Sequence, residues 1–302
     1  MQIPAAYLAV VVIWSTTPLA IQWSAAESDF LFAVTARMVL GALVCLALMG
    51  ALSVPLPWHR AARRTYAAAG LGIYGAMLCV YWAAQHIPSG LISVLFGLAP
   101  LVTGVLAVLW LNERALTPPK LVGMALGLGG LALVFGAHHQ LGPFALWGIL
   151  AMLASVLVHA ASTVWVKRID APISAFAVTG GGLLLAAPLF ALTWLASGAA
   201  WPAALPNRAA WSIVYLALAG SVLGFVLFYF LLQRLESGRV AVIALLTPVL
   251  ALLLGRLAND EPVQLQVWSG ALLIVGGLAL HFWGRAPRGA VTPQGAQREG
   301  AG

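Results

Sequence analysis

Charged residues are scarce in this chain. Asp, Glu, Lys and Arg together make up 8% of its 302 residues, whereas 62% are hydrophobic. A soluble protein of this length needs many more polar groups to cover its surface. The composition therefore excludes a water-soluble globular protein and indicates that lipid surrounds most of the molecule.

Cysteine is almost absent as well. The two cysteines, Cys45 and Cys79, lie inside apolar stretches, where a thiol packs as a small hydrophobic group. This pattern predicts neither a disulfide nor a metal site, and we expect no cofactor.

Long apolar stretches follow one another along the chain, each ended by charge, Pro or Gly. About 20 apolar residues in a helix cross the hydrocarbon core, and lipid cannot satisfy open backbone groups. The stretches therefore predict an all-α membrane protein with ten transmembrane helices. We expect these helices at residues 3–23, 30–50, 65–85, 89–111, 119–136, 144–165, 172–196, 210–232, 238–257 and 263–283.

The basic residues predict the orientation. If the N-terminus is cytoplasmic, the inside loops hold Arg60, Arg63, Arg64, Arg114, Lys120, Lys167, Arg168, Arg234, Arg239, Arg285, Arg288 and Arg298. Only Arg208 and Arg256 then lie outside. Because Lys and Arg resist translocation, we expect both termini in the cytoplasm and the helices in the inner membrane of a bacterium. The net charge of +7 comes from these helix ends, and no stripe of basic residues indicates nucleic-acid binding.

The chain also repeats itself with an offset of 148 residues. In the first copy the matched residues are Gly72, Tyr81, Gln85, Ser89, Gly90, Pro100 and Glu113. In the second copy they are Gly220, Tyr229, Gln233, Ser237, Gly238, Pro248 and Glu261. The offset then falls by one residue, and Gly123, Gly129 and Gly130 correspond to Gly270, Gly276 and Gly277.

This repeat divides the chain into two five-helix halves, residues 1–140 and 141–284. A polar tail, residues 285–302, follows, and we expect it to be flexible and cytoplasmic. Because five is odd, the second half is predicted to enter the membrane upside down. Inverted repeats suit alternating access, in which two related halves exchange their conformations.

With these features the sequence resembles EamA-type members of the drug/metabolite transporter superfamily. The resemblance rests on residues 13–18 (Ile-Trp-Ser-Thr-Thr-Pro), on Arg37, and on two repeat signatures at residues 98–114 and 246–262, each followed by a Gly-rich helix. It covers the chain up to the tail. The resemblance implies a ten-helix carrier with a central cavity lined from both halves, and relatives that export amino acids, related metabolites or toxic compounds.

One face of the third helix carries candidate cavity residues at helical spacing: Tyr74, Met77, Tyr81 and Gln85. Their repeat mates are Val222, Phe225, Tyr229 and Gln233. Such a stripe supplies stacking surface and hydrogen-bond partners for a solute. The alternative is that Tyr81 and Tyr229 pack between helices with their hydroxyls bonded to neighbours.

An ionisable group inside a span is costly and therefore suggests a function. His159, with Ser155 and Ser162 at helical spacing, is either a substrate contact or proton acceptor, or a neutral imidazole bonded between helices. For Arg37 we favour a structural or gating contact near the outer end, where its side chain could snorkel to the interface or pair with Glu27 or Asp29, although a cation there could attract an anionic solute.

Other residues have structural interpretations. Glu113 and Glu261 are predicted mainly to cap the helices that follow them, with proton coupling as the alternative. Pro18, Pro100 and Pro248 each remove a backbone hydrogen bond from a span and are predicted hinges.

The resulting hypothesis is a secondary transporter that exports small polar metabolites such as amino acids. The predicted substrate-binding residues are Trp14, Thr17, Tyr74, Met77, Tyr81, His159, Ser162, Phe225 and Tyr229. Its partners would be a small solute and the bilayer, while proton coupling and the oligomeric state stay open. Export of toxic or drug-like compounds is the alternative within this class, and a channel or scaffold the alternative outside it. An enzyme is disfavoured because neither a His-Glu-x-x-His motif nor paired intramembrane aspartates occur.

Overall fold

The computed structural model describes residues 2–26, 28–111, 118–136, 142–199, 201–234, 243–261 and 264–283. Within these ranges the chain is helical and contains no strand. Several predictions concern residues outside them, namely those for Glu27, Glu113, Arg114, Ser237, Gly238, Arg239 and the tail 285–302.

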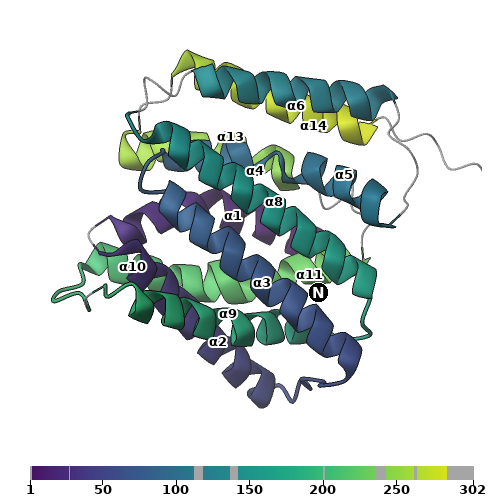
Figure 1. Ribbon diagram of the computed structural model, residues 1–302, viewed down its shortest axis with the longest axis vertical. Helices are drawn as coiled ribbons and strands as arrows, with labels where there is room; N and C mark the ends of the chain where they lie inside the picture. The colour runs from purple at the N-terminus through teal and green to yellow at the C-terminus, as the bar shows by residue number, and fades with distance from the viewer. Residues whose placement is uncertain are drawn as a thin grey trace, which may run out of the picture.

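Figure 1 shows the helices as a stack of layers. In chain order they are α1 (Ile3–Ala25), α2 (Phe30–Ala51), α3 (Arg60–Ala83), α4 (Ser89–Phe96), α5 (Ala99–Leu111), α6 (Pro118–Gly136), α8 (Ala145–Ile169), α9 (Ala175–Ala196), α10 (Asn207–Tyr215), the π-helix η1 (Leu216–Leu223), α11 (Gly224–Arg234), α13 (Ile243–Asn259) and α14 (Leu265–Trp283).

Seven helical segments of the described chain are long and apolar enough to cross a membrane. They are Ile3–Ala25, Phe30–Ala51, Arg60–Ala83, Ser89–Trp110, Ala145–Ile169, Ala175–Ala196 and Asn207–Arg234. Three shorter apolar helices accompany them, Leu121–Val134, Thr247–Asn259 and Leu265–Gly277. The ten segments agree in number and order with the predicted spans, which confirms the all-α class.

Large apolar side chains lie exposed in the middle of these helices. Leu43 of α2, Leu128 of α6 and Leu272 of α14 are each more than 60% exposed. A soluble protein rarely leaves so many such residues in water. The outer surface is therefore suited to lipid.

Side-chain caps explain where two helices begin. Asp29 Oδ1 accepts hydrogen bonds from the backbone N–H groups of Leu31 (2.8 Å) and Phe32 (3.1 Å) at the start of α2. His59 Nδ1 accepts from the Ala62 N–H group at the start of α3. Such caps satisfy N–H groups that have no partner within the helix. The predicted start of the third helix, residue 65, is therefore late, because it was placed where the apolar run begins.

Two predicted spans depart from a regular α-helix. The span predicted at residues 89–111 breaks at Gly97 and Leu98 into α4 and α5, and Pro100 follows this break as the second residue of α5. The span predicted at 210–232 contains the π-helix η1, whereas we expected a plain helix. The predicted span is present, but residues 216–223 within it are a π-helix rather than an α-helix. A π-helix is rare and is frequent at functional sites.

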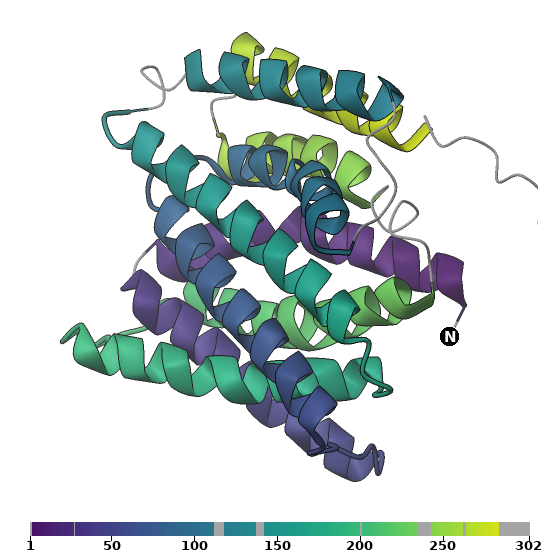
Figure 2. The ribbon, with the colours of Figure 1, turned by 45° about the vertical axis from the view of Figure 1, so that its right-hand side comes forward.

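The two Gly-rich helices, α6 and α14, form a closely packed pair at one edge of the molecule (Figures 1 and 2). A Cβ atom at Gly130 would lie 2.5 Å from the Gly270 carbonyl oxygen, and one at Gly277 would clash with the Gly123 carbonyl oxygen. Residue numbers rise along one helix as they fall along the other, so the pair is antiparallel. Small residues allow this approach where lipid gives no hydrophobic driving force.

We expect Gly130→Ala to lower the free energy of unfolding by about 1–3 kcal/mol, because the added methyl group overpacks the interface with Gly270. Gly129→Ala is the matched control, since a Cβ there meets nothing within 4 Å. Thermal unfolding of the detergent-purified protein, followed by circular dichroism, measures both. Equal stability of the two variants would contradict this packing.

Candidate functional site

Side chains from both ends of the chain surround one cavity of about 90 Å³, which has room for several water molecules. The lining comes from α1, α2, α3, α4, α8, η1, α11 and α13. It consists of Trp14, Thr17, Pro18, Ile21, Arg37, Met77, Val80, Ile92, Ser93, Phe96, His159, Gly220, Phe225 and Thr247. The structure thus brings together five of the predicted substrate-binding residues: Trp14, Thr17, Met77, His159 and Phe225.

Three lining side chains, Trp14, Phe96 and His159, form an aromatic wall of this cavity, and Phe228, which is not itself in the lining, connects Trp14 with His159. Trp14 stacks at a tilt on Phe228, with ring centroids 5.1 Å apart. His159 lies between Phe228 (5.8 Å) and Phe96 (5.0 Å). Sequence reasoning missed Phe96 and Phe228; Phe96 lies at the C-terminal end of α4. The wall offers a solute ring faces and edges, but few hydrogen-bonding groups.

Arg37 is the one cation in the lining, and its side chain is 1% exposed. Its Nε donates a hydrogen bond to Ser221 Oγ (2.9 Å), and its guanidinium carbon lies 5.9 Å from the centroid of the Tyr81 ring. Its Nη1 has no hydrogen-bond partner among the described residues. The lining includes no Asp or Glu side chain, so this charge faces a cavity without a described counter-charge.

The predicted position of Arg37 needs correction. We expected it near the outer surface with Glu27 or Asp29 as partner. Instead, the Arg37 side chain is buried. The Asp29 carboxylate accepts hydrogen bonds at the start of α2, and Glu27 lies outside the described residues.

The π-helix explains why the guanidinium fits. η1 supplies both the Ser221 hydroxyl and Gly220, where a Cβ atom would lie 3.0 Å from Arg37 Nη2. Any larger residue at Gly220 would push against the guanidinium. The irregular backbone therefore provides a hydrogen-bond acceptor and the space for a buried cation in adjacent residues.

Helix α1 also contributes the Thr17 side chain to the lining. Thr17 Oγ1 donates to the Ile13 carbonyl (2.7 Å), and Thr16 shares a hydrogen bond with Tyr215 of α10. Pro18 has no N–H to donate to the Trp14 carbonyl, four residues earlier. α1 nevertheless continues through Pro18, and α13 continues through the buried Pro248.

Four predicted substrate-binding residues lie outside the lining. The Tyr74 hydroxyl shares a hydrogen bond with Thr193 Oγ1 (2.7 Å), and Ser162 Oγ donates to the Ala68 carbonyl (2.9 Å). Tyr229 is buried against Phe228. Their assignment to substrate binding stays a prediction.

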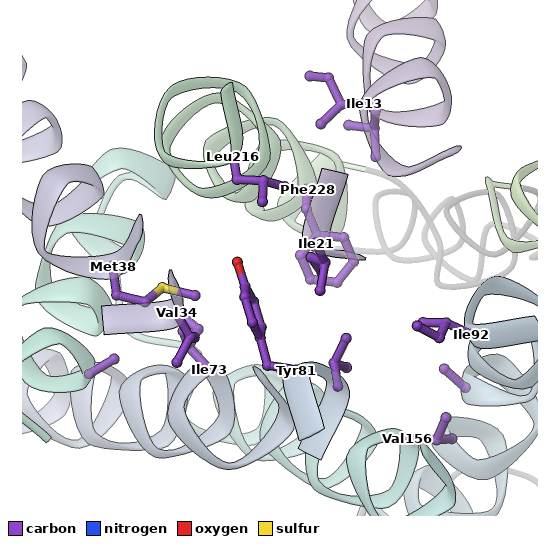
Figure 3. Close-up of a cluster of buried hydrophobic side chains, with 14 of the residues drawn as sticks. Ile13, Ile21, Val34, Met38, Ile73, Tyr81, Ile92, Val156, Leu216 and Phe228 are labelled. Atoms are coloured by element: carbon purple, nitrogen blue, oxygen red, sulfur yellow. The ribbon is translucent and has the colours of Figure 1, made fainter. Parts of the chain in front are cut away.

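Tyr81, the fourth, stands in the middle of the buried cluster shown in Figure 3, among apolar side chains that include Met38 and Leu216. Its hydroxyl has no hydrogen-bond partner within the described chain. This side chain packs between helices, but no neighbour among the described residues satisfies its hydroxyl, as the packing alternative assumed.

A polar network joins the helices at the end of the molecule where α1 and α13 finish. Its centre is Asn259, whose Oδ1 accepts hydrogen bonds from Trp23 Nε1 (3.0 Å) and Arg208 Nη2 (3.4 Å). Asn259 Nδ2 donates to Gln22 Oε1 (3.4 Å) and to Glu261 Oε1 (3.1 Å).

Glu261 extends this network to α4. It is 6% exposed, and its Oε2 accepts a hydrogen bond from the Gly90 N–H group (3.3 Å). The sequence predicted that Glu261 caps the helix that follows it, whereas its described hydrogen bonds run to α4 and Asn259. The network lies directly beyond the cavity, because Gln22 follows the lining residue Ile21 and Gly90 precedes Ile92.

The helices and the lipid-suited surface define a multi-pass membrane protein, and side chains from both ends of its chain line a cavity between the helices. The model of the EamA-like transporter family matches residues 3–136 and, a second time, residues 146–283. The chain belongs to the EamA-like transporter family, and the resemblance drawn from the sequence is confirmed.

Individual relatives are similar at a lower level. "Uncharacterized transporter YvbV" of Bacillus subtilis (strain 168) is 28% identical over 207 residues, 65% of this chain and 64% of that relative, so the match spans less than two thirds of the relative's length. "Probable amino-acid metabolite efflux pump" of Escherichia coli (strain K12) is 27% identical over 232 residues, 74% of this chain and 77% of that protein.

A third relative is "Probable terminal-alkyne amino-acid exporter" of Streptantibioticus cattleyicolor, 28% identical over 219 residues, 71% of this chain and 70% of that protein. One protein of known crystal structure shares the fold with a TM-score of 0.68, 23% identity, and coverage of 92% of this chain and 96% of that chain.

We expect Tyr74→Phe to lower the free energy of unfolding by about 0.6 kcal/mol, because it removes the hydrogen bond between α3 and Thr193 of α9. Tyr81→Phe is the matched control and should leave stability unchanged or raised, since that hydroxyl makes no described hydrogen bond. Chemical unfolding in detergent measures both, and a larger loss for Tyr81→Phe would contradict the assignment.

Proposed function

We propose that this protein is a secondary transporter that exports small polar metabolites such as amino acids by alternating access. The observation that carries the proposal is the cavity, which is lined by helices from both ends of the chain and bounded at one end by hydrogen bonds between them. Two relatives carry names that refer to amino-acid export or efflux. Membership in a transporter family supports the same class.

The transport mechanism rests on two inverted five-helix repeats, residues 1–140 and 141–284, with residues 285–302 as a tail. The family model matches the chain twice, once within each half. The antiparallel pair α6 and α14 supports inversion, because these helices are repeat mates. Helices α2 and α9 are also mates, and they are antiparallel too: Thr35 contacts Phe190 while Met49 contacts Gly180.

Packing between the halves supports the same symmetry. Helix α1 packs on α13, and its mate α8 packs on α4 and α5. In the same way α3 packs on α8. The repeat mates of α3, which are α10, η1 and α11, pack on α1, the repeat mate of α8. A structure built this way can exchange the conformations of its halves, which moves the opening from one face to the other.

Orientation follows from the basic residues. Arg60, Arg63, Arg64, Lys167, Arg168 and Arg234 lie at the helix ends that face the same side as the start of α1, whereas Arg208 and Arg256 lie at the opposite ends. We place the first side in the cytoplasm and the protein in the inner membrane. The Asn259 network then bounds the cavity on the outer side.

Export requires this outer boundary to open. Gln22, Trp23 and Gly90 belong to the first half, and Asn259 and Glu261 to the second, so rocking of the halves has to break these hydrogen bonds. Glu261 also carries the prediction of proton coupling, because its carboxylate joins the two halves through the hydrogen bond from Gly90.

Reconstituted protein should catalyse saturable counterflow of amino acids, and Met77→Trp should abolish it, because the larger side chain fills the cavity. Leu71→Trp is the matched control on α3, since Leu71 is exposed on the lipid-suited surface. Uptake of radiolabelled amino acids into preloaded liposomes measures both. Counterflow of another metabolite class without any amino acid would overturn the substrate assignment, and non-saturable flux would indicate a channel.

Asn259→Ala should open the cavity toward the outer side, because it removes the centre of the polar network. The readout is the labelling rate of a Thr17→Cys probe by an impermeant maleimide applied outside, in a background with Cys45 and Cys79 replaced by Ala. We expect labelling to rise several-fold. Gln85→Ala, an exposed amide at the end of α3, is the control and should leave the rate unchanged. Equal labelling rates in the Asn259→Ala and Gln85→Ala variants would contradict a gating role for the Asn259 network.

A further inference from the structure

We propose that Arg37 binds a carboxylate of the transported solute, so that the substrate class is small carboxylates with an apolar side chain. This inference rests on the proposed transport function and deepens it. It begins from the one ionised side chain in the cavity lining, which the structure buries and leaves with an unpartnered donor nitrogen.

A guanidinium stays protonated at any physiological pH and presents five N–H donors in a planar fork. In Arg37, Nε is committed to Ser221 and Nη1 has no partner among the described residues. A buried cation without a counter-charge is costly, so a ligand that completes its hydrogen bonds gains both charge pairing and geometry. A carboxylate matches this fork with two parallel hydrogen bonds.

The described carboxylates nearby do not compete for this position. Asp29 is engaged at the start of α2, and Glu261 is engaged with Gly90 and Asn259. The cavity lining contains no acidic residue. No carboxylate of the lining therefore pairs with the Arg37 guanidinium, and this position is open to the carboxylate of a solute.

The remainder of the cavity selects the rest of the solute. Apolar and aromatic side chains make up most of the lining, among them Ile21, Met77, Phe96 and Phe225. These surfaces favour an aliphatic or aromatic group. An amine that lacks a carboxylate finds no counter-charge in the lining and meets the Arg37 cation, so electrostatics disfavours it. The same argument separates amino acids and apolar carboxylic acids from cationic drug-like compounds.

The test compares three probes with one apolar group: L-phenylalanine, 3-phenylpropionate and phenethylamine. Isothermal titration calorimetry of the purified full-length protein gives each Kd without requiring transport. Wild-type protein should bind the two carboxylates and bind phenethylamine at least tenfold more weakly. Arg37→Gln should raise the Kd of both carboxylates about ten- to hundredfold, since a hydrogen-bonded charge pair is lost.

Three further variants distinguish loss of the Arg37 charge from a general loss of folding. Arg63→Gln removes a cation from the exposed start of α3 and should leave every Kd unchanged. Arg37→Lys keeps the charge but loses the fork, and it should restore part of the affinity for carboxylates. Gly220→Ala keeps the arginine and pushes on its Nη2, so it should raise the Kd of the carboxylates several-fold even where Arg37→Gln does not fold.

The inference is overturned if none of the probes binds, if phenethylamine binds as tightly as 3-phenylpropionate, or if Gly220→Ala and every folded Arg37 variant keep the carboxylate Kd within twofold of wild type. Its failure differs from failure of the proposed function. Carboxylate binding that depends on Arg37, without flux in liposomes, sustains this site and refutes transport. Saturable flux of a solute without a carboxylate sustains transport and refutes this site.

Discussion

Lipid offers no partner to an open backbone N–H or C=O group, and this constraint decides where the chain can depart from an α-helix. Both described departures within spans have a buried side that packs on neighbouring helices. The turn at Gly97 and Leu98 is buried, with Pro248 and Ile274 next to Gly97. The π-helix η1 lies against Arg37. The cavity occurs beside both, since Phe96 precedes the turn and Gly220 belongs to η1.

A second consequence concerns the cost of a buried cation. Inside a membrane protein a charged side chain is tolerated where protein or a cavity surrounds it, and not where it faces hydrocarbon. Arg37 satisfies this condition through Ser221 and the space left by Gly220. The irregular backbone and the charge therefore depend on each other: η1 makes room for the guanidinium, and the guanidinium donates to a hydroxyl of η1.

Much of the fold follows from local patterns. Apolar length predicted the helices, but α3 begins earlier than its apolar run because His59 caps its first turn. The stripe on α3 shows why the site was only partly predictable. Met77 reaches the cavity, whereas Tyr74 contacts α9 and Tyr81 stands in the core, although helical spacing places all three on one side. One helical face is wide enough to meet several neighbours, and spacing alone does not say which neighbour covers which part.

The sequence by itself determined the membrane class, the order of the helices, the internal repeat of residues and the resemblance to the EamA-type transporters. Each of these properties depends on the length of apolar stretches or on residue types along the chain. Helices can be predicted in this way because their hydrogen bonds join residues only four apart. Only the tertiary structure decided that Arg37 meets Ser221 and that Glu261 meets Gly90, pairs separated by 184 and 171 residues. These contacts arise when distant helices pack, and side-chain size and backbone irregularity at the point of contact select the partners. The candidate site is made of such contacts, so the sequence could name several of its residues but not their arrangement.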